Sequence, residues 1–109
     1  MAYDEHTAER VRKMLTGRVS FTEKHMFGGV AFMVRGHMAI GVNKTDLMVK
    51  VGKPNHDEAI AQPHAREMDF TKRPMKGFVF VDPDGFQTDP DLKSWVDRAV
   101  KFNATLDPK

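Results

Sequence analysis

Hydrophobic residues at helical spacing mark the beginning of the chain. Residues 4–16 place their apolar side chains three and four positions apart, which predicts an amphipathic helix, and Gly17 is a typical helix end. Glu9 and Lys13 lie four positions apart on the outer side, where an ion pair stabilises a helix. Residues 19–24 alternate between apolar and polar side chains and predict a short strand. The apolar side of the predicted helix consists of Ala8, Val11, Met14 and Leu15.

Two strand-like runs follow within EKHMFGGVAFMVRGHMAIGV, residues 23–42, and a gap of two residues separates them. Such a gap is typical of a β-hairpin. Counting back from the turn pairs Val34 with His37 and continues without interruption to Ala31 opposite Ile40. In this register one face carries Val30, Phe32, Val34, His37 and Ala39. The other face carries Ala31, Met33, Met38, Ile40 and Val42.

Both faces of this predicted hairpin are too apolar to lie against water. Each face therefore needs a cover. We expect helices on one face, and either more of the chain or a second subunit on the other.

The second half of the chain predicts further strands. DLMVKV at residues 46–51 alternates in the same way, so residues 26–51 predict an antiparallel meander. FVFV at residues 78–81 is an apolar run of strand length, bounded by turn residues. Residues 66–77 between these runs predict a short strand and a long connection.

Two more helices complete the prediction. Asn55 is placed to cap a short helix that Pro63 ends, and Asp89 is placed to cap a final helix with Pro90 as its first residue. We therefore expect an α+β fold in which an antiparallel meander is flanked by N- and C-terminal helices. The apolar stripe of the final helix consists of Leu92, Trp95, Val96, Ala99, Phe102 and Leu106.

Gly28 and Gly29 raise the possibility of a phosphate-binding loop. Such a loop follows a strand and opens a helix, so that backbone N–H groups converge on the anion. Here the β-branched and aromatic run from residues 30–34 follows, and it favours a strand. We therefore interpret the two glycines as a bend or bulge between strands.

Length and composition place the chain among single-domain globular proteins. It has 109 residues, of which 40% are hydrophobic and 29% charged, and we expect one domain over residues 1–109. No window is apolar enough for a membrane span, and the charged start does not resemble an export signal. We therefore expect a cytoplasmic protein. The absence of cysteine excludes disulfides and thiolate chemistry.

Residues that could carry catalysis or metal binding are scattered. The five histidines include no pair at i and i+4 with a carboxylate between them, and no serine lies in a glycine-flanked elbow. We therefore expect no enzyme, no cofactor and no metal. His25 and His37 are the pair to check, because adjacent strands could bring them together as a small-ligand or metal site.

A modest excess of basic residues in the middle of the chain leaves a second alternative open. A basic rim without exposed rings gives weak, sequence-indifferent nucleic-acid binding. The interleaved phenylalanines are more simply explained as core residues. The basic residues are Lys24, Arg35, Lys44, Lys50, Lys53, Lys72, Arg73 and Lys76, and the phenylalanines are Phe27, Phe32, Phe70 and Phe78.

Three motifs in order resemble a known family. MFGGVAFMVRGHMAIGV, DLMVKVG and AREMDFTKRPMKGFVFV together look like the amino-terminal domain of the TfoX/Sxy competence regulators of bacteria. The resemblance extends from the first predicted helix to the last. It implies a small α/β domain, an antiparallel sheet with terminal helices, that often associates as a dimer.

The resemblance also implies a non-enzymatic regulatory role, because full-length relatives promote expression of DNA-uptake genes, apparently through other proteins. In those relatives a second, helical domain follows. The family has no assigned catalytic residues to carry over. We expect the partner contacts, with an unknown regulatory protein, to come from the hairpin around Arg35 and from the connection with Asp69, Lys72, Arg73 and Lys76.

Overall fold

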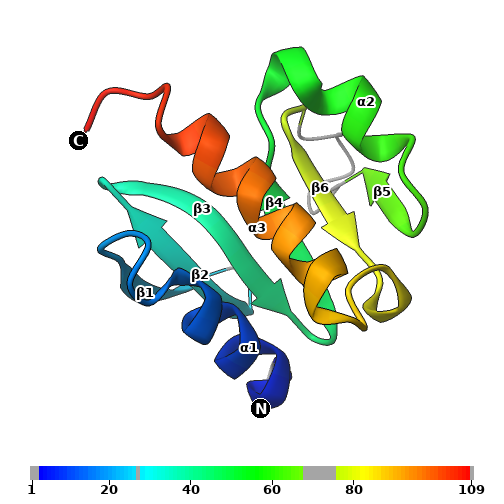
Figure 1. Cartoon of the computed structure of the whole chain (residues 1–109), viewed down its shortest axis with the longest axis horizontal. Helices are drawn as coiled ribbons and strands as arrows, with labels where there is room; N and C mark the ends of the chain where they lie inside the picture. The colour runs from blue at the N-terminus through cyan, green and yellow to red at the C-terminus, as the bar shows by residue number, and fades with distance from the viewer. Residues whose placement is uncertain (1–2, 27, 68–75, 109) are drawn as a thin grey trace.

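The described residues fold into a six-stranded sheet with helices packed against it (Figure 1). The computed structural model describes residues 3–26, 28–67 and 76–108. The helices are α1 (Glu5–Leu15), α2 (His56–Ile60) and α3 (Asp89–Asn103), with short 3₁₀ turns η1 (Lys53–Asn55) and η2 (Pro83–Gly85). The strands are β1 (Thr22–Met26), β2 (Gly29–Val34), β3 (His37–Asn43), β4 (Asp46–Lys50), β5 (Ala65–Glu67) and β6 (Phe78–Val81).

The strand order is β1-β2-β3-β4-β6-β5, and every neighbouring pair is antiparallel. The predicted meander is therefore confirmed for β2, β3 and β4, and the α+β class is confirmed for the fold. The first strand lies at residues 22–26 rather than 19–24. The second half of the chain adds β6 beside β4 and leaves β5 at the edge.

The register of the central hairpin differs from the predicted one. Val34 lies opposite His37 as expected, but the pairing then shifts by one residue, so that Phe32 lies opposite Ile40. Ala39 is the extra residue of a β-bulge, and a bulge moves every later side chain to the opposite face. Ile40 and Val42 therefore point toward the helices, and the faces predicted for them are wrong.

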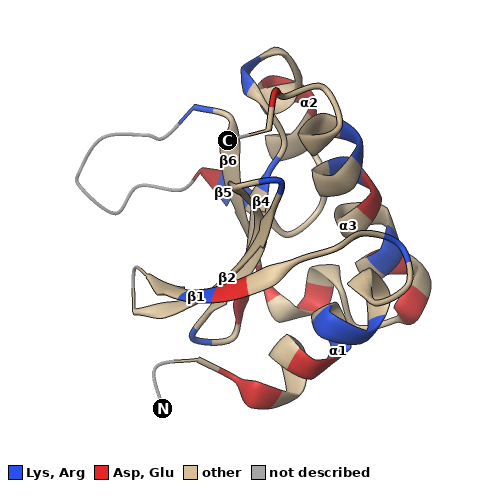
Figure 2. Ribbon diagram, turned by 90° about the vertical axis from the view of Figure 1, so that its left-hand side faces the viewer, with Lys and Arg blue, Asp and Glu red and all other residues tan. Residues whose placement is uncertain are grey.

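The main core lies between the sheet and the helices. Figure 2 shows α1, α2 and α3 on one side of the sheet. Alternate residues of the strands meet α1 and α3 there, because side chains of a strand point to opposite faces in turn. The fully buried members of this core include Val11, Leu15, Val30, Phe32, Ile40, Val42, Leu47, Val49, Leu92 and Val96.

Polar side chains cap the N-terminal ends of α1 and α3. Asp4 accepts hydrogen bonds from the backbone and hydroxyl of Thr7, and these bonds hold the pKa of Asp4 below its usual value. Thr88, rather than Asp89, caps α3 by accepting from the Asp91 N–H.

Two further predictions at helix ends are wrong. The amide of Asn55 donates to the Val51 carbonyl at 2.9 Å instead of capping the short helix. The final helix ends at Asn103, so Leu106 lies beyond it.

The glycine pair lies in a hairpin. Gly28 has φ of 73° and occupies the turn after β1, and Gly29 is the first residue of β2. Neither residue opens a helix, so the interpretation as a bend between strands is confirmed. Across residues 3–26, 28–67 and 76–108, no helix combines the length and apolarity that a membrane span requires.

Candidate interaction surface

The sheet face opposite the helices carries its own apolar cluster. We call it the helix-free face, since Figure 2 shows none of the labelled helices on this side. Ala31 and Met48 are fully buried at its centre, and Met38 and Phe80 are 8% exposed. The partly buried residues packed around them are Met26, Met33 and Phe78. The prediction that both sheet faces are apolar is therefore confirmed.

One register row crosses the whole helix-free face. It runs from Lys24 on β1 to Arg66 on β5, so a cation ends the row at each edge of the sheet. Between these cations, Gly41 lies beside Met48, and a Cβ at Gly41 would come within 2.7 Å of the Met48 methyl group. The centre of this face is thus closed by its own side chains. The residues of the row are Lys24, Ala31, Gly41, Met48, Phe80 and Arg66.

Arg66 shows how charge is held at the edge of the helix-free face. Its guanidinium group donates to Asp46 at 2.7 Å and also to Asp82. The same group lies 5.0 Å from the ring centroid of Phe80. The positive charge at this edge is therefore balanced within the chain.

Arg35, one of the predicted partner-contact residues, lies in the exposed turn between β2 and β3. Its guanidinium group donates to the Asn103 carbonyl at 2.9 Å, and the Asn103 amide donates back to the Val34 carbonyl at 2.9 Å. Because carbonyls at a helix C-terminus lack helical partners, Arg35 and Val34 together tie the hairpin to the end of α3. A partner contact through Arg35 stays a prediction.

The other predicted contact residues lie mostly outside the described part of the chain. Asp69, Lys72 and Arg73 fall within residues 68–75, and the structure describes only Lys76, which is exposed. These four residues therefore stay predicted contacts.

The residue after Lys76 has a buried partner that the sequence did not predict. The Gly77 N–H donates to Nδ1 of His56 at 2.9 Å, and His56 is only 3% exposed. The other ring nitrogen, Nε2, lies 3.6 Å from Glu67. His56 therefore joins α2 to the start of β6. Little in the sequence indicates this hydrogen bond, because the partner of His56 is a backbone group far along the chain.

The histidine pair proposed as a ligand site does not form. His25 lies opposite Val30 on β2, whereas His37 lies opposite Val34, four residues or about 13 Å along that strand. The His37 Nε2 atom is instead 2.7 Å from the Asp107 carbonyl. Among the described residues, no group of three His, Asp or Glu side chains could hold a metal ion.

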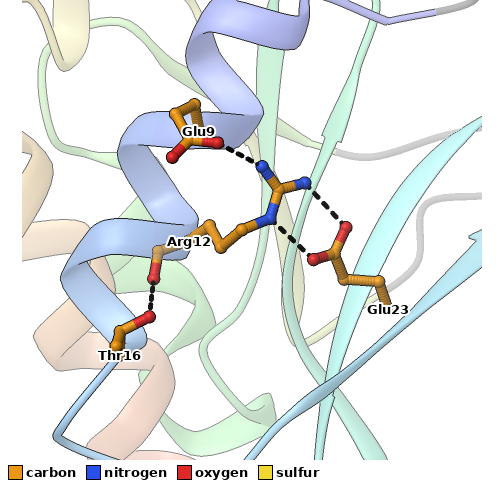
Figure 3. A network of polar contacts seen from close by, with 4 residues as sticks. All are labelled: Glu9, Arg12, Thr16 and Glu23. Atoms are coloured by element: carbon orange, nitrogen blue, oxygen red, sulfur yellow. Dashed lines mark hydrogen bonds and ion pairs between the residues drawn. The ribbon is translucent and has the colours of Figure 1, made fainter.

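An ion-pair network links α1 to the edge strand β1 (Figure 3). Arg12 donates to both carboxylate oxygens of Glu23 at 2.7 Å and to Glu9 at 2.5 Å. These contacts raise the pKa of Arg12, chiefly through Glu23, and lower the pKa of Glu23. Glu9 thus pairs with Arg12 three positions on, and the predicted pair with Lys13 is wrong.

The described basic residues of the middle of the chain are spread over several elements. Arg35 and Lys44 lie in the turns at opposite ends of β3. Phe32 is fully buried on the helix side, and the ammonium group of Lys50 lies 5.7 Å from the ring centroid of Phe78. Phe27 and Phe70 lie outside the described residues, and nucleic-acid binding stays a prediction.

Comparison with known proteins adds one finding to this geometry. The family model described as TfoX N-terminal domain matches residues 13–103, which include all six strands and α3. Neither the curated proteins nor the solved structures give a significant match to the chain. The matched range covers most of the 109 residues, and the chain belongs to the TfoX N-terminal domain family.

Proposed function

We propose that this chain is a regulatory module of the competence-regulator type that acts in the bacterial cytoplasm through protein contacts rather than by catalysis. One observation carries the proposal: the labelled helices all cover one face of the sheet, and the other face has a second apolar cluster edged by partly exposed Met26, Met33 and Phe78. A sheet with two apolar faces needs material on both. Membership of a family that is not a known enzyme family supports the same conclusion.

In this proposal, a regulatory protein binds the helix-free face. Methionine side chains adapt to differently shaped partners, because they are unbranched and flexible. Homodimer formation, which the family resemblance implied, is a separate part of the proposal. Light scattering across micromolar concentrations tests it: a strict monomer at every concentration would contradict the dimer and leave the regulatory role standing.

Gene deletion with complementation tests the regulatory role. In the native host, loss of the gene should lower the transcripts of DNA-uptake genes, and the wild-type chain should restore them. Met33→Glu places a charge on the helix-free face at a partly exposed position and should fail to restore them. Lys101→Glu, on the exposed side of α3, is the matched control and should restore them fully.

Two results would contradict this proposal. Unchanged transcripts after deletion would remove the competence-type role. Full restoration by a folded Met33→Glu protein would show that the helix-free face is not the working surface. Circular dichroism of both purified variants checks that the comparison concerns folded proteins.

A further inference from the structure

A cleft of about 320 Å³ lies beside the N-terminal half of α3. Three segments that are distant in sequence form it: the turn at residues 62–64 between α2 and β5, the 3₁₀ turn η2, and residues 91–98 of α3. Figure 1 shows these segments meeting on the right of the molecule, where α3 begins. The volume is at the lower end of the range for small-ligand pockets.

The two turns that form one wall of this cleft are packed directly on each other. The Asp82 N–H donates to the His64 carbonyl at 2.9 Å. A Cβ at Gly85 would come within 2.6 Å of Val81 and 3.0 Å of the Cβ of His64, so the contact requires glycine. The wall is therefore held by a hydrogen bond and by close packing.

The opposite wall presents a cation whose charge is already balanced. Arg98 donates to both carboxylate oxygens of Glu58, at 2.7 and 2.9 Å. Its guanidinium group also lies 5.2 Å from the ring centroid of Trp95. Arg98 thus has limited capacity for an anionic ligand.

Several polar side chains of the cleft have no partner within the described part of the chain. These are the ring of His64, the carboxylate of Asp91 and the hydroxyl of Ser94. From the described residues, Asp84 accepts a single long hydrogen bond, 3.4 Å, donated by Gln87. With Arg98 balanced by Glu58, the two aspartates leave the cleft with an excess of negative charge.

We infer that this cleft binds a guanidinium or ammonium group, carried by an arginine or lysine side chain of a partner or by a free amine. Asp84 and Asp91 accept its hydrogen bonds, and the apolar surface of Pro63 contacts its methylene stem. The inference goes beyond the proposed function and does not rest on it, since the cleft lies among α3, η2 and the turn before β5, away from the cluster of the helix-free face.

Trp95 provides a direct readout, because it is the only tryptophan of the chain and lines the cleft. Tryptophan fluorescence is followed while the full chain is titrated with arginine amide and, separately, with a blocked Gly-Arg-Gly peptide. A blocked Gly-citrulline-Gly peptide is the matched ligand control, since citrulline keeps the shape of arginine and lacks its charge. We expect saturable changes with both arginine ligands, weakened by salt, and none with citrulline.

The protein variants test the role of the carboxylates. Asp84→Asn should weaken binding about fivefold, as expected for an ion pair open to solvent. Asp57→Asn, on the exposed side of α2 and outside the cleft, should leave the affinity for the arginine peptide unchanged. Tighter binding of the peptide than of arginine amide would identify a protein side chain as the source, and tighter binding of arginine amide a free amine.

Three results would overturn the inference. They are equal binding of the citrulline peptide, an unchanged affinity in a folded Asp84→Asn protein, and a fluorescence titration without saturation in the millimolar range. Inorganic phosphate that displaces the arginine peptide at constant ionic strength would show instead that Arg98 makes this an anion site. Loss of binding here leaves the gene-deletion result of the proposed function unaffected, so the two proposals fail separately.

Discussion

Gly28 and Gly29 are adjacent, yet replacing each by alanine should have very different effects. A Cβ at Gly29 would lie 2.1 Å from the Val42 carbonyl oxygen and 3.0 Å from the Val42 carbonyl carbon, both backbone atoms of β3. Relief requires β2 and β3 to separate by about 1 Å, which stretches hydrogen bonds of the ladder beyond their normal length. Two weakened bonds at about 1 kcal/mol each, together with overpacking of about 1 kcal/mol or more, give a cost of about 3 kcal/mol.

Gly28→Ala is the matched control. Its nearest neighbour would be the side-chain amide of Asn43 at 3.8 Å, so space is available. The cost comes from φ of 73°, about 1–2 kcal/mol for a non-glycine residue. The smaller conformational entropy of the unfolded chain offsets about 0.5 kcal/mol in both variants alike, so it cancels from the comparison. Gly29→Ala should therefore be the more destabilising by about 1.5 kcal/mol.

Urea unfolding followed by fluorescence of Trp95 measures both changes in the free energy of unfolding. For a chain of this size the difference corresponds to a melting temperature lower by roughly 6 °C in the Gly29 variant. Equal costs for the two variants, or a Gly29→Ala cost below about 1 kcal/mol, would refute the close approach of β2 and β3 at this position.

Three further changes test other parts of the fold. Phe32→Ala removes a fully buried ring that packs edge-on against Phe21 at 5.7 Å, and it should cost about 3–5 kcal/mol in urea unfolding; less than about 1 kcal/mol would mean that the ring is not in the core. His56→Ala leaves the buried Gly77 N–H without an acceptor and should cost about 2–4 kcal/mol, whereas His56→Asn keeps an acceptor and should cost less; equal costs would contradict the role of this hydrogen bond. Glu23→Gln should destabilise the protein at pH 7 and progressively less as the pH falls, because Arg12 depresses the pKa of Glu23 in the folded protein. The stabilisation by the ion pair is complete above the pKa of an unfolded-state glutamate, about 4.3, and is lost as the pH falls through the lower pKa of the folded state. Unfolding at pH 7 and pH 3 measures this, and a gap between wild type and variant that does not shrink in acid would contradict the ion pair.

Local patterns were sufficient to predict most elements of the fold. The helical stripe that ends at Leu15, the two-residue turn at Arg35 and the apolar run at residues 78–81 each appear in the structure as helix, hairpin and strand. These features depend on interactions within about ten residues, and such interactions are written directly in the order of side chains. The three family motifs led to the same prediction, because the resemblance implied an antiparallel sheet with terminal helices.

Long-range pairing decided the features that the patterns left open or placed wrongly. The bulge at Ala39 moved Ile40 to the helix side, because β3 must satisfy β2 and β4 at once and a hairpin count includes only one of them. The buried bond between His56 and Gly77 and the convergence of Asp84 and Asp91 on one cleft join segments that are distant along the chain. The types of these side chains do not indicate that they lie close together, because their proximity results from packing of the whole chain around one core.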